Sequence, residues 1–136
     1  MTIVIDALQP SVSHGFDSTS EWSSIIAGRH NALLEGPRDW TDAILWRLGP
    51  CLREPVIWMT PHSVGTLPAG TCGALVLQDV ASLRRDDQAR LFAWLDGGHR
   101  HVISTTMHPL FPLIGTGVFD EALYYRLNVI RVPAHE

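Results

Sequence analysis

An uninterrupted apolar run, Ala74-Leu75-Val76-Leu77, is the feature that most constrains the fold of this chain. A strand that is covered on both faces, as in the interior of a parallel sheet, has a continuous apolar run, whereas a half-exposed strand alternates. Comparable short runs occur at residues 31–35, 55–59, 101–106 and 128–132, and segments with helical patterns separate them. Strands that alternate with helices predict an α/β fold, with a mainly parallel five-stranded sheet between two layers of helices.

The helices between these runs are predicted from their end signals. Ser18-Thr19-Ser20-Glu21 has the pattern of a capping box, in which a hydroxyl and a glutamate satisfy free helix amides. It predicts a helix over residues 21–27. Asp39 is expected to cap the next helix. Further helices are expected over residues 86–96 and 119–127.

Length and composition favour one domain. The chain has 136 residues, of which 46% are hydrophobic, so we expect an N-terminal arm over residues 1–20 and a single α/β domain over residues 21–136. A net charge of -4 and a pI near 5.9 give no cluster of basic charge, so direct nucleic-acid binding is not expected. Neither a secretory signal nor a stretch of about 20 apolar residues occurs, so we expect no membrane association and a cytoplasmic location.

Cysteine and histidine spacing does not indicate a metal or redox site. Cys51 and Cys72 lie far apart without C-x-x-C spacing, so both are expected to be reduced thiols. His99-Arg100-His101 is the closest histidine cluster, and no carboxylate or cysteine is placed near it to complete a metal site. We therefore predict no metal site.

Four segments carry a family resemblance: Gly73-Ala74-Leu75-Val76-Leu77-Gln78-Asp79-Val80, Gln88-Ala89-Arg90-Leu91-Phe92, residues 101–106 and residues 117–130. In this order they resemble the Walker B strand, the helix after it, the sensor strand, and the arginine-finger helix with its next strand, of the AAA+ ATPase domain of sigma-54-dependent transcription activators. The resemblance extends from about residue 31 to 132. It implies a three-layer P-loop core with strand order 5-1-4-3-2, numbered along the chain, here without the family's helical lid.

The phosphate-binding turn of that family is changed in this chain. In the family, this turn holds nucleotide phosphates with two glycines and a lysine. The corresponding segment here, Gly36-Pro37-Arg38-Asp39-Trp40-Thr41-Asp42, keeps only the first glycine and has Asp42 in the lysine position. All ten basic residues are arginine, so no lysine is available. A carboxylate about 4 Å from a phosphate charge repels it by about 1 kcal/mol in water and about 4 kcal/mol at an intermediate dielectric. Asp39 and the bulky Trp40 are expected to add charge and volume.

The other catalytic positions are changed as well. Gln78 and Asp79 stand where the family has an aspartate for magnesium and a glutamate that orients the attacking water. Met107 takes the position of the sensor asparagine, Asp120 that of the first arginine finger, and only Arg126 remains of the two fingers. We therefore predict no catalytic residues and neither ATP nor magnesium as a cofactor. The degenerate nucleotide pocket is expected to consist of Gly36, Arg38, Asp39, Trp40, Thr41, Asp42, Gln78, Asp79, Thr106 and Met107.

The resemblance, together with the changes at the family's nucleotide-binding and catalytic positions, implies a catalytically inactive, regulatory or protein-interaction module linked to transcription. Between Arg47 and Gly73 there are too few residues for the insertion that contacts sigma-54 in the family, and its G-A-F-T-G-A motif is absent. The expected partner is a protein, either a sigma-54 activator or a second copy of this chain. An apolar, proline-bounded loop over residues 108–114 is the first candidate surface. The possible interface residues are Phe111, Leu113, Asp120, Tyr124 and Arg126.

Several alternatives stay open. Arg38 or Arg47 could replace the lysine and Asp79 could hold a metal ion, which would give weak nucleotide binding. An enzyme of another type would need a nucleophile beside its base, and no spacing defines such a pair. The helix over residues 119–127 could simply pack on the sheet with Arg126 in solvent. Four tryptophans are expected to be in the core or half-buried: Trp40, Trp46, Trp58 and Trp94.

Overall fold

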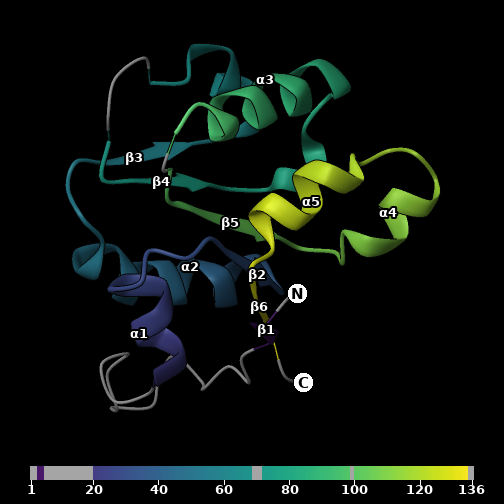
Figure 1. Cartoon of the computed structure of the whole chain (residues 1–136). Coiled ribbons are helices and arrows are strands. Elements are labelled where there is room, and N and C mark those ends of the chain that lie inside the picture. The colour runs from purple at the N-terminus through teal and green to yellow at the C-terminus, as the bar shows by residue number, and fades with distance from the viewer. Residues whose placement is uncertain (1–2, 5–19, 69–71, 99, 135–136) are drawn as a thin grey trace.

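The computed structural model describes residues 3–4, 20–68, 72–98 and 100–134. They form one six-stranded sheet in the order β1-β6-β2-β5-β4-β3 (Figure 1). Every neighbouring pair is parallel, so the carboxyl ends of the strands lie at one edge of the sheet and the amino ends at the other. The strands are β1 (Ile3–Val4), β2 (Ala32–Glu35), β3 (Val56–Met59), β4 (Ala74–Leu77), β5 (Val102–Thr106) and β6 (Ile130–Pro133).

Helices cover both faces of the sheet. In Figure 1, α1 and α2 lie on one face and α3 and α5 on the other, while the short α4 lies beside α5. None of the described helices is long and apolar enough to span a membrane. The helices are α1 (Ser20–Ile26), α2 (Arg38–Leu48), α3 (Arg85–Asp96), α4 (Phe111–Gly115) and α5 (Glu121–Leu127), with 3-10 turns η2 (Gly49–Cys51), η3 (Pro61–Thr66) and η4 (Val80–Ser82).

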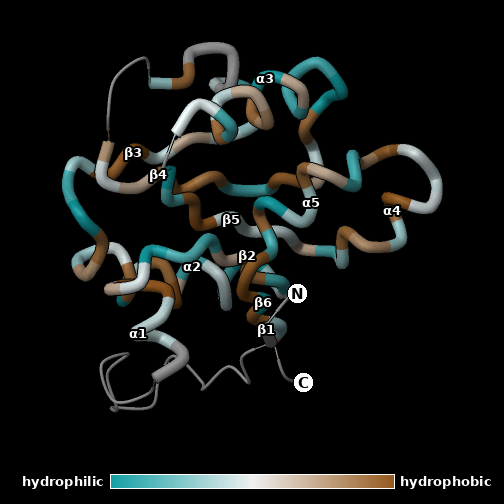
Figure 2. Tube along the Cα trace, in the orientation of Figure 1, coloured by the Kyte–Doolittle hydropathy of each residue, from teal (hydrophilic) through white to brown (hydrophobic). Residues whose placement is uncertain are grey.

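An apolar core lies on each side of the sheet. Successive residues of a strand point to opposite faces, so Ala74 and Val76 join the core beneath α1 and α2, whereas Leu75 and Leu77 join the core beneath α3 and α5. All four side chains are fully buried. Figure 2 shows β4 as a largely hydrophobic segment between the helical layers. The continuous apolar run is therefore an interior strand, as predicted.

The predicted strand order is confirmed, with one addition. The five predicted runs are β2, β3, β4, β5 and β6, and their order β6-β2-β5-β4-β3 is the expected 5-1-4-3-2. In addition, β1 pairs with β6, with Ile3 opposite Ile130 and Val4 opposite Arg131. These two residues belong to the expected N-terminal arm. Ser18 and Thr19 of the expected capping box lie outside the described residues, and α1 begins at Ser20.

Two local predictions are wrong. Asp39 does not cap α2, because the helix already begins at Arg38, with Pro37 at the N-cap position and no side-chain cap. The fixed φ of Pro37 leads the chain directly into the helix, and Asp39 lies in the first turn, where a carboxylate favours the helix dipole. Residues 108–114 are not a loop throughout, because α4 begins at Phe111. Its proline lies in the first turn, where no amide hydrogen is required.

Candidate functional site

The carboxyl edge of the sheet holds a cavity of about 380 Å³, at the edge where open α/β sheets bind ligands. It is lined by the segments that follow β2, β3, β4 and β5. Seven of the predicted pocket residues line it: Arg38, Thr41, Asp42, Gln78, Asp79, Thr106 and Met107. The cavity is completed by five residues that sequence reasoning did not place there: Thr60, Pro61, His62, Ser82 and Thr105.

A direct hydrogen bond joins two of the predicted pocket residues, Gln78 and Asp42. The Gln78 side-chain amide donates from Nε2 to Oδ1 of Asp42 over 3.2 Å. The sequence resemblance assigns Asp42 to the lysine position of the phosphate-binding turn and Gln78 to the magnesium-aspartate position of the Walker B strand. The contact joins a carboxylate on the segment after β2 to an amide directly after β4. Oδ2 of Asp42 also lies 3.9 Å from Nε of Arg38. This ion pair is exposed, so it offsets the negative charge of Asp42 only weakly.

Asp79 is held by its own turn. Its φ of 59° places it in the left-handed region, where non-glycine residues are uncommon. Its amide donates to Oγ1 of Thr105 over 3.0 Å, and its carboxylate accepts from the Ser82 hydroxyl over 2.8 Å. No cluster of three potential metal ligands of the His, Cys, Asp and Glu types occurs in the described ranges. The observed role of Asp79 is thus to shape the turn into η4.

Three predicted pocket residues do not line the cavity. Trp40 packs over Gly36: a Cβ on that glycine would lie 2.7 Å from Cε3 of the indole. Trp40 also contacts the core beneath α1 and α2, and Asp39 is exposed. Neither side chain therefore adds the charge or volume to the cavity that was expected from sequence. Gly36 is required for the close approach of the indole, which is a packing role.

The residues predicted for the sensor position and the finger helix make contacts with neighbouring residues of the fold. Thr106 donates from Oγ1 to the carbonyl of His108 over 2.7 Å, while Met107 is exposed. Asp120 is the N-cap of α5, because its carboxylate accepts from the Leu123 amide over 2.8 Å. Arg126 pairs with Asp96 and lies 5.4 Å from the centre of the Phe92 ring.

The predicted interface residues do not form one exposed surface. Tyr124 is only 6% exposed, and Leu113 is half-buried against the same core, so both serve mainly in packing. Phe111 is 61% exposed and contacts the Tyr124 ring edge-on, at 6.0 Å between centroids. Of this set, Phe111 is the apolar residue that remains available to a partner.

Comparison with known proteins establishes the family. A family model for the sigma-54 interaction domain matches residues 60–134, more than half of the chain. The chain belongs to the sigma-54 interaction domain family. No curated protein matches it.

The solved structures most similar in fold include those of NtrX from Brucella abortus. The complex of NtrX with ADP has a TM-score of 0.62 at 22% identity and aligns with 87% of this chain and 34% of the NtrX chain. The complex with ATP has a TM-score of 0.59 at 19% identity, over 96% of this chain and 38% of NtrX. This sigma-54 interaction domain thus has the fold of part of NtrX and spans little more than a third of the NtrX chain.

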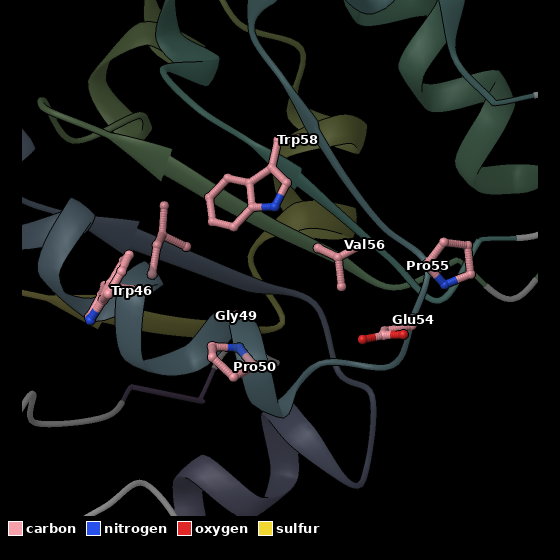
Figure 3. Close-up of a pocket in the computed structure, with 8 residues that line it drawn as sticks. Trp46, Gly49, Pro50, Glu54, Pro55, Val56 and Trp58 are labelled. Carbon is pink, nitrogen blue, oxygen red and sulfur yellow. The ribbon is translucent and has the colours of Figure 1, made fainter.

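A second candidate site lies between α2 and the edge strand β3. Trp46 is 83% exposed, so the prediction that it is in the core or half-buried is wrong, whereas Trp58 is 51% exposed and is half-buried rather than part of the core. They flank an open groove of about 850 Å³ (Figure 3). Trp22, by contrast, is buried at 2% exposure. The lining of this groove, the α2–β3 groove, is Leu45, Trp46, Gly49, Pro50, Glu54, Pro55, Val56 and Trp58.

The exposure of both tryptophans follows from their positions in the fold. The buried residues of α2 are Thr41, Ile44, Leu45 and Leu48, which form one face at helical spacing. Trp46 follows Leu45 by one residue and projects away from that face. Trp58 lies on β3, which has a neighbour on one side only. The helical period could have identified Trp46 from sequence, whereas the exposure of Trp58 depends on the strand order.

Proposed function

We propose that this chain is a sigma-54 interaction domain that does not hydrolyse ATP and acts as a regulatory, protein-binding module. The hydrogen bond from Gln78 to Asp42 carries this proposal. A nucleotide triphosphate brings several negative charges to the turn after β2, and Asp42 would meet them with a further negative charge. The bond also gives the Asp42 carboxylate a hydrogen-bond donor within the protein.

The magnesium site supports the same conclusion. The carboxylate that would bind the ion is replaced by the amide of Gln78, which is a weaker ligand for a hard cation. Asp79 is the nearest carboxylate along the strand, but its side chain accepts the Ser82 hydroxyl. This contact occupies one oxygen of Asp79, so the carboxylate serves the turn into η4.

Weak nucleotide binding is the second candidate function, because one observation favours it. Arg38 lines the cavity together with Asp79, so a guanidinium and a carboxylate do lie in the same site. Arg47, the other arginine considered, is not in the lining. In addition, two of the similar structures are of NtrX in complex with ADP and with ATP. A direct titration with nucleotide separates the two candidates.

The protein-binding part of the proposal is supported by exposed aromatic side chains. Trp46, Trp58, Phe111 and Tyr125 are each more than half exposed. Tryptophan and tyrosine are enriched in the energetically important parts of protein interfaces. We propose the α2–β3 groove as the contact surface and the AAA+ domain of a sigma-54 activator as the partner. A second copy of this chain is the other partner to test.

Binding to a purified AAA+ domain of a sigma-54 activator is expected to be saturable in analytical ultracentrifugation. Trp46→Ser is expected to weaken it at least tenfold, because an aromatic anchor at an interface contributes about 2 kcal/mol or more. Phe111→Ser is the control: it removes another exposed aromatic side chain, on α4, which does not line the groove. A chain that neither binds this domain nor self-associates would contradict the protein-binding part of the proposal, and equal losses in both variants would contradict the choice of surface.

A further inference from the structure

A cavity of about 400 Å³ lies at the amino edge of the sheet, opposite the candidate nucleotide pocket. Its walls come from the turn between α1 and β2, the end of α3, the start of β5 and the end of α5. We call it the amino-edge cavity. Its lining is Gly28, Arg29, Asn31, Leu95, Gly98, Arg100, His101 and Arg126.

The charge of this cavity differs from that of the chain. Of the described residues, three arginines and no acidic residue line it, although the chain as a whole has a net charge of -4. The nearest described acidic partner is Asp96, which pairs with Arg126 from outside the lining. Three guanidinium groups near a single carboxylate produce a local positive potential, which favours an anion.

The guanidinium groups are held in position by the fold. Arg29 donates from Nη2 to the carbonyl of Gly73 over 2.9 Å. Arg100 donates from Nε to the carbonyl of Trp94 over 3.2 Å, and its guanidinium lies 4.4 Å from the centre of that indole. Arg126 is fixed by Asp96 and by the face of Phe92. Such anchoring reduces the entropy that each side chain would lose when it binds an anion.

Arg29 provides a second, independent sign of a missing ligand. Its Nε is buried and has no hydrogen-bond partner within the part of the chain that the structure describes. Buried polar atoms are nearly always paired, so an unpaired one requires an explanation such as an ion or a ligand. Arg29 also has a φ of 54°, in the left-handed region that non-glycine residues rarely occupy and that clusters at functional sites.

His101 adds a polar group without adding charge. Its ring is 2% exposed, and Nε2 lies 3.0 Å from the carbonyl of His30. Burial, together with the positive charge of Arg29, lowers the pKa of His101 to about 4. The ring is therefore neutral near pH 7, and the positive charge of the cavity comes from the three arginines alone.

We propose that the amino-edge cavity binds a phosphate group, with Arg29, Arg100 and Arg126 as its ligands. Planar guanidinium groups match the oxygens of phosphate with paired hydrogen bonds, which gives both strength and geometric selectivity. The Asn31 side chain also lines the cavity. It accepts a hydrogen bond from the Val102 amide and donates one to the Arg126 carbonyl, so it links the segment before β2 to the start of β5 and the end of α5. The phosphate can be free or part of a small phosphorylated molecule.

The test is a titration of the wild-type chain with inorganic phosphate at constant ionic strength, followed by calorimetry and by amide NMR shifts. We expect saturable binding with a millimolar or lower Kd, and shifts centred on residues 28–31 and 100–102. Arg126→Gln is expected to weaken binding at least fivefold, because one of three cationic ligands is lost. Its folding should be intact, since its ion pair is solvent-exposed. Arg90→Gln, which removes an exposed arginine elsewhere on α3, is the matched control.

Three outcomes would overturn the proposal: no saturable binding of phosphate, equal binding of chloride at the same ionic strength, or equal affinity in Arg126→Gln and Arg90→Gln. Glucose 6-phosphate and a phosphoserine-containing dipeptide serve as probes for the source of the phosphate. A lower Kd for either than for inorganic phosphate supports a phosphorylated ligand, and a lower Kd for inorganic phosphate supports the free ion. Arg29→Gln gives a second variant from another wall, and it is expected to weaken phosphate binding at least as much as Arg126→Gln.

Discussion

Gly73→Ala is expected to lower the free energy of unfolding by about 3 kcal/mol or more. A Cβ at this position would lie 1.7 Å from the carbonyl oxygen of Arg53 and 2.7 Å from the carbonyl carbon of Glu54. These are backbone atoms, so a rotamer change cannot relieve the overlap, and the start of β4 would have to move away from the segment before β3. Forced overlaps of this kind in a packed region typically cost 1–3 kcal/mol, and larger values mark backbone displacement.

The displacement would also disturb contacts at both ends of Gly73. Its amide donates to the carbonyl of Pro55 over 2.9 Å, and its carbonyl accepts from Arg29. Urea unfolding followed by tryptophan fluorescence measures the effect. Gly115→Ala is the control, because a Cβ there has no neighbour within 4 Å, and it should change stability by less than about 1 kcal/mol. Similar stabilities of the two variants would show that the packing of Gly73 is not as described.

Gln88→Leu is expected to cost about 3–5 kcal/mol of stability. The Gln88 side chain is 3% exposed and makes three hydrogen bonds to the backbone. Its Nε2 donates to the carbonyls of Leu83 and Val118, over 3.1 and 3.0 Å, and its Oε1 accepts from the Asp120 amide over 2.8 Å. Leucine has a similar volume but leaves these backbone groups without partners, and each unsatisfied buried group costs about 1–3 kcal/mol.

The effect should be specific to the hydrogen bonds of Gln88. Arg90→Leu, on the exposed side of the same helix, removes only a surface ion pair with Asp87 and is expected to change stability by less than about 0.5 kcal/mol. Amide hydrogen exchange should show faster exchange at Asp120 and along α5 in Gln88→Leu, because the start of α5 loses its anchor on α3. Unchanged exchange there, with wild-type unfolding, would contradict the anchoring role.

The sheet could be predicted from sequence because its strands are short apolar runs, and interior strands such as Ala74–Leu77 have few alternatives. The family resemblance then supplied the strand order, which the runs alone do not determine. The resemblance did not include β1. This strand consists of only two residues, Ile3 and Val4. The start of α2 was misplaced because proline can stand at the N-cap position without a side-chain cap.

The site was only partly predictable. The resemblance brought Asp42 and Gln78 to one pocket, but their hydrogen bond joins residues 36 positions apart and requires the folded geometry. Trp40 was placed in the pocket because it lies between two lining residues in sequence, whereas the helix turns it onto Gly36. The amino-edge cavity had no sequence signal, since Arg29, Arg100 and Arg126 come from separate segments that meet only at the amino ends of the strands.

The central claim, that Asp42 and Gln78 disable nucleotide binding, is tested most directly by calorimetric titration of the purified chain with magnesium-ATP and magnesium-ADP. We expect no binding in the nucleotide pocket up to millimolar nucleotide. Asp42→Lys combined with Gln78→Asp should bind at least tenfold more tightly than wild type, because repulsion of the phosphates becomes attraction and a magnesium ligand returns. Asp39→Lys with Gln78→Asp is the control, since it makes the same net charge change but places the lysine outside the lining of the cavity. All titrations are repeated in an Arg126→Gln background, which weakens phosphate binding at the amino-edge cavity. Saturable micromolar binding of magnesium-ATP in that background, weakened by Asp79→Ala, would contradict the account and establish a nucleotide-binding domain.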